Sequence, residues 1–167
     1  MEILGVSERN EALAEELQER VDIVVHKLKF FPDKPQIAFI SDLNEIVVAY
    51  DEPLNNIVSK AGGNLIYANS WESLIDMNPD ILILSLNGES IESSLPKVSG
   101  LIQMPNFTEL KAVKENKIFI LKNNLLKSES ATDKVDVLEA LAEMITPKYF
   151  NFGLEGNVWI NFSVSFN

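Results

Sequence analysis

The hydrophobic positions near the start of the chain recur at the spacing of an α-helix. Ser7 can cap this helix and Pro32 lies beyond its end, which predicts a helix of about 20 residues. Steps of three and four residues separate its main apolar positions, which are Ala14, Leu17, Val21, Val24 and Leu28. These five residues form one narrow apolar stripe, called the inner seam below.

From residue 36 onward, short apolar runs alternate with helical patterns. The expected strands are residues 36–41, 64–67, 81–86, 100–104 and 117–121. The expected helices are residues 71–76, 90–95, 107–115 and 132–145, together with one that begins near Asp51 and ends at Gly62. The segment after Pro147 is expected to be irregular or to form a short edge segment.

Strands joined by helices favour a parallel sheet that is covered on both faces, because right-handed crossovers need those helices. We therefore expect a three-layer α/β fold with about five parallel strands, preceded by a long helix. The 167 residues contain no internal repeat and no convincing linker, so we expect one domain over 1–167. Within it, residues 1–30 form the first helix, 35–147 the sheet and its helices, and 148–167 a tail.

Composition and charge exclude several functions. The net charge of −11 argues against nucleic acid and anionic membrane as partners, because phosphates need cationic side chains. There is no cysteine, no apolar run of bilayer length and no basic, apolar secretory signal at the start. As written, the chain is expected to be cytoplasmic and not inserted in a membrane. If an upstream segment was removed, we expect the protein in the periplasm or at the cell surface.

Several segments resemble one family when they are taken in order. They are residues 61–64 (AGGN), 70–74 (SWESL), 78–84 (NPDILIL), 110–120 (LKAVKENKIFI) and 150–156 (FNFGLEG) with Trp159. Together they resemble the C-terminal lobe of the substrate-binding proteins of vitamin B12, haem and siderophore ABC importers. The tail is similar to that of the signal-less cobalamin-binding branch.

This resemblance implies a non-catalytic binding lobe for cobalamin or a related large chelate, with no required cofactor. Its ligand would be cobalamin, another corrin, haem or a siderophore. Its partners would be a missing N-terminal lobe or an ABC transporter. The resemblance implies that Glu72 would pair with arginines of the transporter. Alternatively, Glu72 needs no partner, because a carboxylate is favourable in the first turn of a helix. Residues 127–132 depart from the family, because relatives often carry a Pro-Gly-Pro-Arg-like turn there.

Ligands of open α/β sheets bind outside the carboxyl ends of the strands. This rule selects Tyr50, Trp71, Asn87, Gly88 and Glu89 as ligand-binding candidates. The two aromatic side chains suit a flat macrocycle, and Gly88 permits close backbone approach. Alternatively, Trp71 packs sideways on the sheet edge, and residues 87–89 form a plain turn before a capped helix.

No catalytic or metal site is expected. His26 is the only histidine and stands far in sequence from the candidate loops, and no nucleotide loop or nucleophile elbow is present. A small α/β enzyme is therefore disfavoured. The remaining hypotheses are a binding lobe and a structural or interaction domain of the same fold that has lost its ligand.

The first helix is also expected to mediate a homodimer. A two-lobed relative covers this helix from both sides, so a single lobe would leave part of the inner seam exposed. Pairing of two seams across a twofold axis would bury it. The alternative is a monomer whose seam packs fully on its own domain.

Overall fold

Strands β1, β4 and β5 form the centre of the sheet. The computed structural model describes residues 2–43, 47–48, 50–126 and 128–163. Among them, one sheet has the strand order β2-β1-β4-β5-β6, and β3 pairs with β1. Its strands are β1 (Gln36–Asp42), β2 (Val47–Val48), β3 (Asn64–Leu65), β4 (Ile81–Leu84), β5 (Ile118–Leu121) and β6 (Trp159–Asn161). Strands β1, β3, β4 and β5 are parallel, whereas β2 and β6 run antiparallel to their neighbours.

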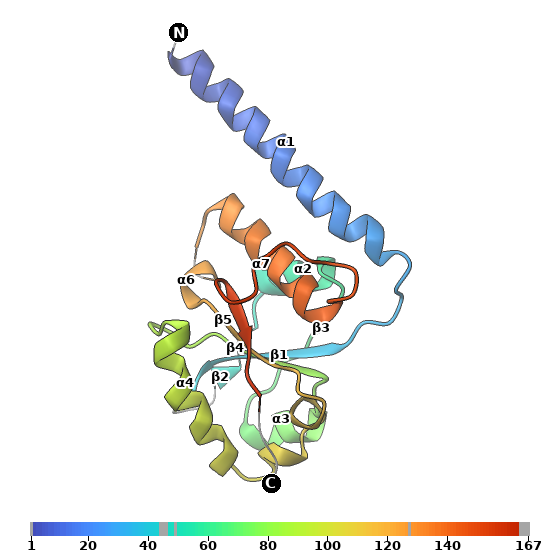
Figure 1. Cartoon of the computed structure of the whole chain (residues 1–167), viewed down its shortest axis with the longest axis vertical. Helices are drawn as coiled ribbons and strands as arrows, with labels where there is room; N and C mark the ends of the chain where they lie inside the picture. Colours follow the sequence, from blue (N-terminus) through green and yellow to red (C-terminus); the bar gives the residue numbers. More distant parts are fainter. Residues whose placement is uncertain (1, 44–46, 49, 127, 164–167) are drawn as a thin grey trace.

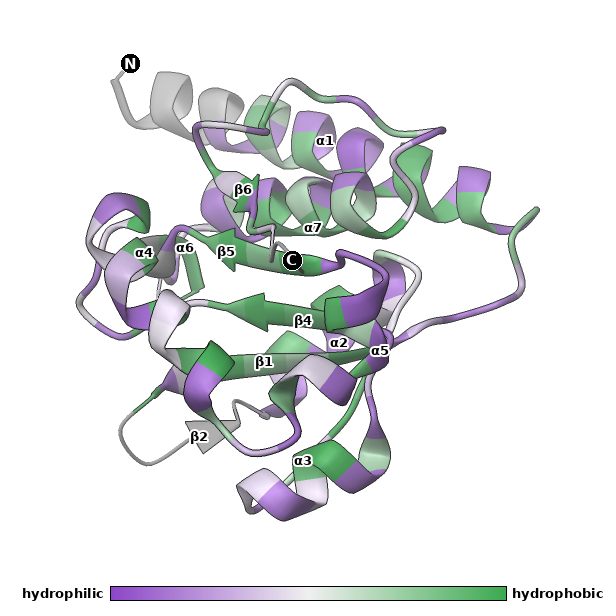
Figure 2. Cartoon of the chain, turned by 60° about the horizontal axis from the view of Figure 1, so that its bottom comes forward, coloured by the Kyte–Doolittle hydropathy of each residue, from purple (hydrophilic) through white to green (hydrophobic). Residues whose placement is uncertain are grey.

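The central strands are apolar throughout because both faces of the sheet are covered (Figure 2). Alternate residues of each strand enter different cores: Ile37 and Phe39 contribute to one, Ala38 and Ile40 to the other. The first core is closed by α2 (Glu52–Lys60) and α7 (Ala131–Ile145). The second is closed by the helices on the opposite face, which are α3 (Trp71–Met77), α4 (Ile91–Ser99), η1 (Gly100–Gln103), η2 (Phe107–Glu109) and α5 (Lys111–Lys114).

The expected three-layer α/β fold is thus confirmed, with three differences in detail. Residues 100–104 do not form a strand, because α4 continues directly into the 3₁₀ helix η1 and buries Leu101 in the same core as Val98. A short apolar run has the same pattern in either state, so only packing decides between them. The antiparallel strand β2 extends the parallel sheet at one edge, and the short helix α6 (Asn123–Leu126) follows β5. Strand β6 at the other edge is the short edge segment that was expected after Pro147.

Helix α1 (Glu2–Leu28) lies outside α7 and is longer than predicted, so position 7 is inside the helix and not at its start. Leu17 and Val24 are buried on the domain itself, where Val24 contacts Ala142 and Phe150. The inner seam is therefore part of the domain's own core from Leu17 onward and is not the exposed strip that the dimer hypothesis assumed.

A polar cluster fastens α1 to α7. The Arg20 guanidinium donates hydrogen bonds to Asp136, at 2.6 Å, and to the buried carboxylate of Glu139. These two carboxylates raise the pKa of Arg20 above its ordinary value despite partial burial. Helix α1 runs opposite to β4 and β5 (Figure 2), so its N-terminal end points to the side of the sheet where those strands end.

Candidate functional site

The loops after β1 and β4 leave the sheet in opposite directions. Strand β1 leads through α2 to β3 on one side, whereas β4 leads through α4 and α5 to β5 on the other (Figure 1). Backbone pairing with β1 continues past the end of β4: Ser85 N donates to Ile40 O at 2.9 Å, and Asn87 N donates to Ser41 O at 3.1 Å. Such a switch point opens a crevice at the carboxyl edge of a parallel sheet, where ligands bind in this fold class.

Two cavities meet at this switch point. One of about 430 Å³ lies toward α2 and α7, and another of about 480 Å³ lies toward α4 and η1. Both are lined by Ser41 and Asn87, so the side chain of Asn87 stands between them. A single ligand larger than either cavity would therefore contact Asn87 whichever side it enters.

The turn at residues 86–89 carries three of the predicted site residues. Glu89 N donates to Leu86 O at 3.1 Å, and Gly88 has φ +76°, a backbone conformation that favours glycine. Ser90 then caps α4 by accepting from Ser93 N at 3.0 Å. A turn followed by a capped helix is the structural alternative raised from the sequence, and it also places Asn87 and Glu89 on the cavity walls.

The carboxylate of Glu89 is held in its charged form. It accepts hydrogen bonds from Lys97 Nζ and from Ser93 Oγ, the latter at 2.6 Å. These donors, Lys97 foremost, hold the pKa of Glu89 below its ordinary value. Gly88 and Glu89 also line a third cavity of about 470 Å³, which Lys122 borders from the end of β5.

The cavity beside α2 and α7 has a polar floor and an apolar wall. Its floor includes the buried Ser85, and its rim includes Lys134, whose amine lies 3.9 Å from the carboxylate of Glu129. Asp51 on the same rim caps α2 by accepting from Leu54 N at 2.8 Å. Ser41 and Lys134 were not predicted from the sequence, because they are distant in the chain and line one cavity only in the folded protein.

Trp71 is not among the residues that line these cavities. Its indole Nε1 donates to Pro105 O at 2.8 Å, and its ring stacks on Phe107 with centroids 6.4 Å apart. It therefore packs α3 against the following loop, and the fold does not bring it together with Asn87. Glu72 is exposed beside it, in the first turn of α3.

Tyr50 is adjacent in sequence to Asp51, which lines the first cavity. It is 43% exposed and meets Tyr67 edge to face, with ring centroids 5.8 Å apart. The two tyrosines form an exposed aromatic pair beside the end of β3, and only Tyr50 was predicted from the sequence.

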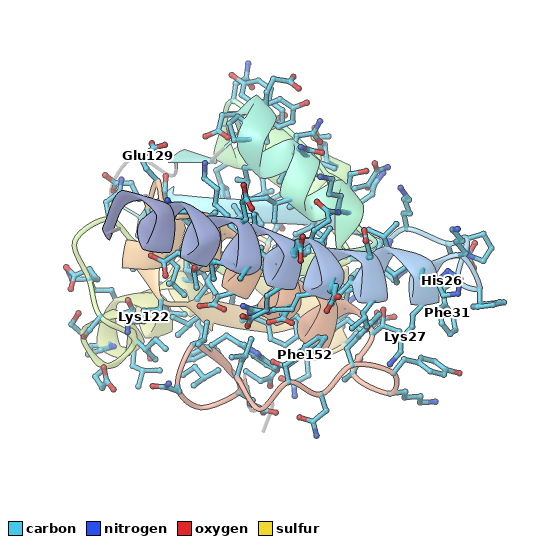
Figure 3. All side chains as sticks on the ribbon, turned by 90° about the horizontal axis from the view of Figure 1, so that it is seen from above. His26, Lys27, Phe31, Lys122, Glu129 and Phe152 are labelled. Atoms are coloured by element: carbon cyan, nitrogen blue, oxygen red, sulfur yellow. The ribbon has the colours of Figure 1, made fainter. Side chains whose placement is uncertain are left out.

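His26 lies at the opposite end of the molecule from Lys122 and Glu129 (Figure 3). Within the described part of the chain, no group of three or more His, Cys, Asp or Glu side chains could hold a metal ion. The candidate site thus offers hydroxyl, amide, ammonium and carboxylate groups, which bind a ligand through hydrogen bonds and charge.

Comparison with known proteins decides the family, because the model of the periplasmic binding protein family matches residues 2–125. The chain belongs to the periplasmic binding protein family. The resemblance found in the sequence is therefore confirmed. Members of this family are binding proteins of transport systems and not enzymes. Comparison with curated proteins gives no significant match.

Solved structures of this family share the fold. A periplasmic binding protein from Veillonella parvula DSM 2008 is 23% identical with a TM-score of 0.73, and the match covers 86% of this chain and 52% of that one. A periplasmic haem-binding protein from Pseudomonas aeruginosa is 18% identical with a TM-score of 0.72, covering 99% and 62%. A protein of an ABC-type Fe³⁺-hydroxamate transport system from Saccharomonospora viridis DSM 43017 is 20% identical with a TM-score of 0.68, covering 83% and 50%.

The chain spans 50–62% of the length of these three structures. The second of these proteins binds haem and the third belongs to a system for Fe³⁺-hydroxamate, and none of the three is named for cobalamin. The periplasmic character of the family does not support the cytoplasmic location that was expected from the chain as written. No helix in the described part of the chain is long and apolar enough to cross a membrane.

Proposed function

We propose that this chain is one ligand-binding lobe of a substrate-binding protein for a large iron chelate, either a haem or a ferric hydroxamate. The observation that carries the proposal is the pair of cavities that meet at Asn87, at the switch point between β1 and β4. The family and the ligands of the haem and hydroxamate proteins support this choice of ligand. Cobalamin stays a third candidate, on the resemblance of the tail alone.

The polar groups of the site suit the periphery of such a chelate. Hydroxamate and propionate oxygens are hydrogen-bond acceptors, and the site offers the amide of Asn87 and the ammonium groups of Lys97 and Lys134. Glu89 holds the Lys97 ammonium in place through an ion pair. The metal would stay bound by its own chelator, since the described residues form no metal-ligand group.

A single lobe covers only one side of the ligand. Binding sites usually bury about 70–90% of a ligand's surface, so a lobe on its own binds more weakly than a closed cleft. Helix α1 runs opposite to β4 and β5 (Figure 2), so a lobe joined before it would lie on the side of the sheet where these strands end. We propose that lobe and an ABC transporter as partners, with Glu72 as a transporter contact and a location outside the cytoplasm.

Titration of three probes tests the proposal: haemin, ferrioxamine B as a ferric hydroxamate, and cyanocobalamin. Isothermal titration calorimetry should detect one of the iron chelates. Asn87→Ala should weaken its binding about threefold to tenfold, which corresponds to the loss of one hydrogen bond. Asn56→Ala is the matched control, because Asn56 is exposed on α2 and does not line the three cavities.

Two outcomes would contradict the proposal. Binding that is equally strong in wild type and Asn87→Ala would place the ligand elsewhere on the protein. No heat with any of the three probes would favour the alternative, an interaction domain of this fold that has lost its ligand. The absence of the Pro-Gly-Pro-Arg-like turn at residues 127–132 is the sequence feature that favours this alternative.

A further inference from the structure

We propose that two copies of this chain associate through α1 in antiparallel orientation, using a face of the helix other than the inner seam. A second set of positions, called the outer stripe here, follows α1 and the turn after it in steps of 3, 4, 3, 4 and 3 residues. It consists of Leu13, Glu16, Arg20, Ile23, Lys27 and Phe30. Residues at this spacing share one face of a helix, and here that face contains three of the exposed large apolar side chains. Leu13 is 43% exposed, Ile23 51% and Phe30 74%.

The outer stripe is complementary to itself when it is read backwards. In an antiparallel pair whose twofold axis passes between residues 21 and 22, position i faces position 43 − i of the second copy. Leu13 then faces Phe30, Glu16 faces Lys27, and Arg20 faces Ile23. Because each pairing occurs twice, the interface contains two apolar contacts and two ion pairs, with Arg20 and Ile23 of both copies at its centre.

A groove at the end of α1 can accommodate an apolar side chain of the second copy. It has a volume of about 340 Å³ and is lined by Lys27, Phe30, Phe31 and Tyr149. The rings of Phe31 and Tyr149 lie 4.3 Å apart and form its wall. The Lys27 ammonium is held at its rim, 3.5 Å from Tyr149 O. In the antiparallel pair, Leu13 of the second copy enters this groove.

The charges along α1 favour the same orientation. Residues 11–22 carry five carboxylates, those of Glu11, Glu15, Glu16, Glu19 and Asp22. The last turn of α1 carries Lys27, and Lys29 follows in the turn directly after the helix. An antiparallel pair sets the acidic half of each helix beside the basic end of the other, whereas a parallel pair opposes like charges.

The outer stripe is available for this contact. The domain's own core uses the inner seam, where Leu17 and Val24 are buried. Helix α1 lies on the outside of the molecule, and no other described element covers it on the side seen in Figure 3. Of the stripe, Arg20 is engaged with Asp136 and Glu139, which leaves Ile23 exposed beside it. A contact of one helix face is small, so the dimer is weak and its population depends on concentration.

Charge reversal tests the pairing of Glu16 with Lys27. In sedimentation velocity at low salt, Glu16→Lys and Lys27→Glu should each weaken dimerisation about tenfold or more, because like charges then face each other twice. The double variant Glu16→Lys/Lys27→Glu should restore it, and so should a mixture of the two single variants. Glu15→Lys is the matched control on another face of α1, and it should change the dissociation constant by about twofold at most.

Crosslinking tests the register, because the natural chain contains no cysteine. A mixture of Leu13→Cys and Phe30→Cys should form a mixed disulfide, which needs the two Cα atoms within about 7 Å. Neither variant should crosslink alone, since two copies of position 13 would lie about 25 Å apart along the helix axis. Circular dichroism checks that each variant is folded.

Three results would overturn the proposal. The first is a wild-type monomer at the highest concentration and lowest salt. The second is equal weakening by Glu15→Lys and Glu16→Lys. The third is that the double charge reversal does not restore dimerisation, or that the mixture of the two cysteine variants forms no mixed disulfide.

Discussion

Glu143 offers a direct test of how the C-terminal tail is held on the sheet. Its carboxyl group is buried on α7, with the residue 4% exposed, and it accepts two hydrogen bonds from the tail. Trp159 Nε1 donates at 3.0 Å and Phe152 N at 2.7 Å. Trp159 also begins β6, which pairs with β5. Replacing Glu143 should therefore weaken the attachment of the whole tail.

The expected loss follows from the two donors that are left behind. In Glu143→Ala, the buried Trp159 N–H loses its partner, which costs about 1–3 kcal/mol, and the partly buried Phe152 N–H adds about 1 kcal/mol. We expect a total near 3 kcal/mol, against about 5–15 kcal/mol for a whole domain. For a chain of this length, 3 kcal/mol lowers the melting temperature by roughly 6–12 °C. Glu143→Gln keeps one carbonyl acceptor and should lose about half as much.

Urea unfolding followed by far-UV circular dichroism measures this loss. The midpoint should fall while the slope stays constant, since the same surface is exposed on unfolding. Glu155→Ala is the matched control, because Glu155 is an exposed carboxylate of the same tail, and it should change stability by less than about 0.5 kcal/mol.

A double-mutant cycle isolates the bond to the indole. Trp159→Phe keeps an aromatic ring and removes the N–H, so the cycle with Glu143→Ala should give a coupling of about 1 kcal/mol. A cost below about 1 kcal/mol for Glu143→Ala, with no coupling, would show that Glu143 does not hold the tail.

Two further predictions concern the packing around β1. The Asp80 carboxylate accepts hydrogen bonds from Gln36 N and Lys111 Nζ, both at 2.8 Å. Burial raises the pKa of Asp80, but these two interactions outweigh burial and hold the pKa below its ordinary value. Its stabilisation is present at neutral pH and is lost as pH falls through the lowered pKa, so Asp80→Asn should flatten the dependence of urea midpoints on pH below about 4. Gly63→Ala would place a Cβ 2.3 Å from the buried Ile37 Cδ1 and should cost about 1–3 kcal/mol in urea unfolding, whereas Gly100→Ala meets open space and should cost nothing.

Local chemistry in the sequence was enough for most element boundaries. Asp51 caps α2, and Gly62 follows its end with φ +96°, the left-handed conformation that the pattern predicted. The buried strands β1, β4 and β5 were predictable because a strand covered on both faces is apolar at every position. The turn at Gly88 was predictable from the same local rules, whereas Asn87 was selected as a ligand-binding candidate by the carboxyl-edge rule.

Contacts between distant residues were decided only by the tertiary structure. Residues 100–104 are apolar enough for a strand, and the continuation of α4 makes them a 3₁₀ helix. Trp71 and Asn87 both follow strands of the sheet, yet the indole bonds to Pro105 while Asn87 enters the cavities. Nothing near Trp71 in the sequence indicates that partner, because it is 34 residues away.

Helix α1 shows most clearly which features follow from the sequence and which follow from the tertiary structure. The sequence determined that residues at steps of three and four lie on one helix face, since that follows from 3.6 residues per turn alone. The inner seam and the outer stripe both satisfy this spacing. Only the position of α7, Phe150 and the Arg20 cluster decided that the seam is buried while Ile23 and Phe30 stay exposed, because burial depends on which surface of the domain lies opposite.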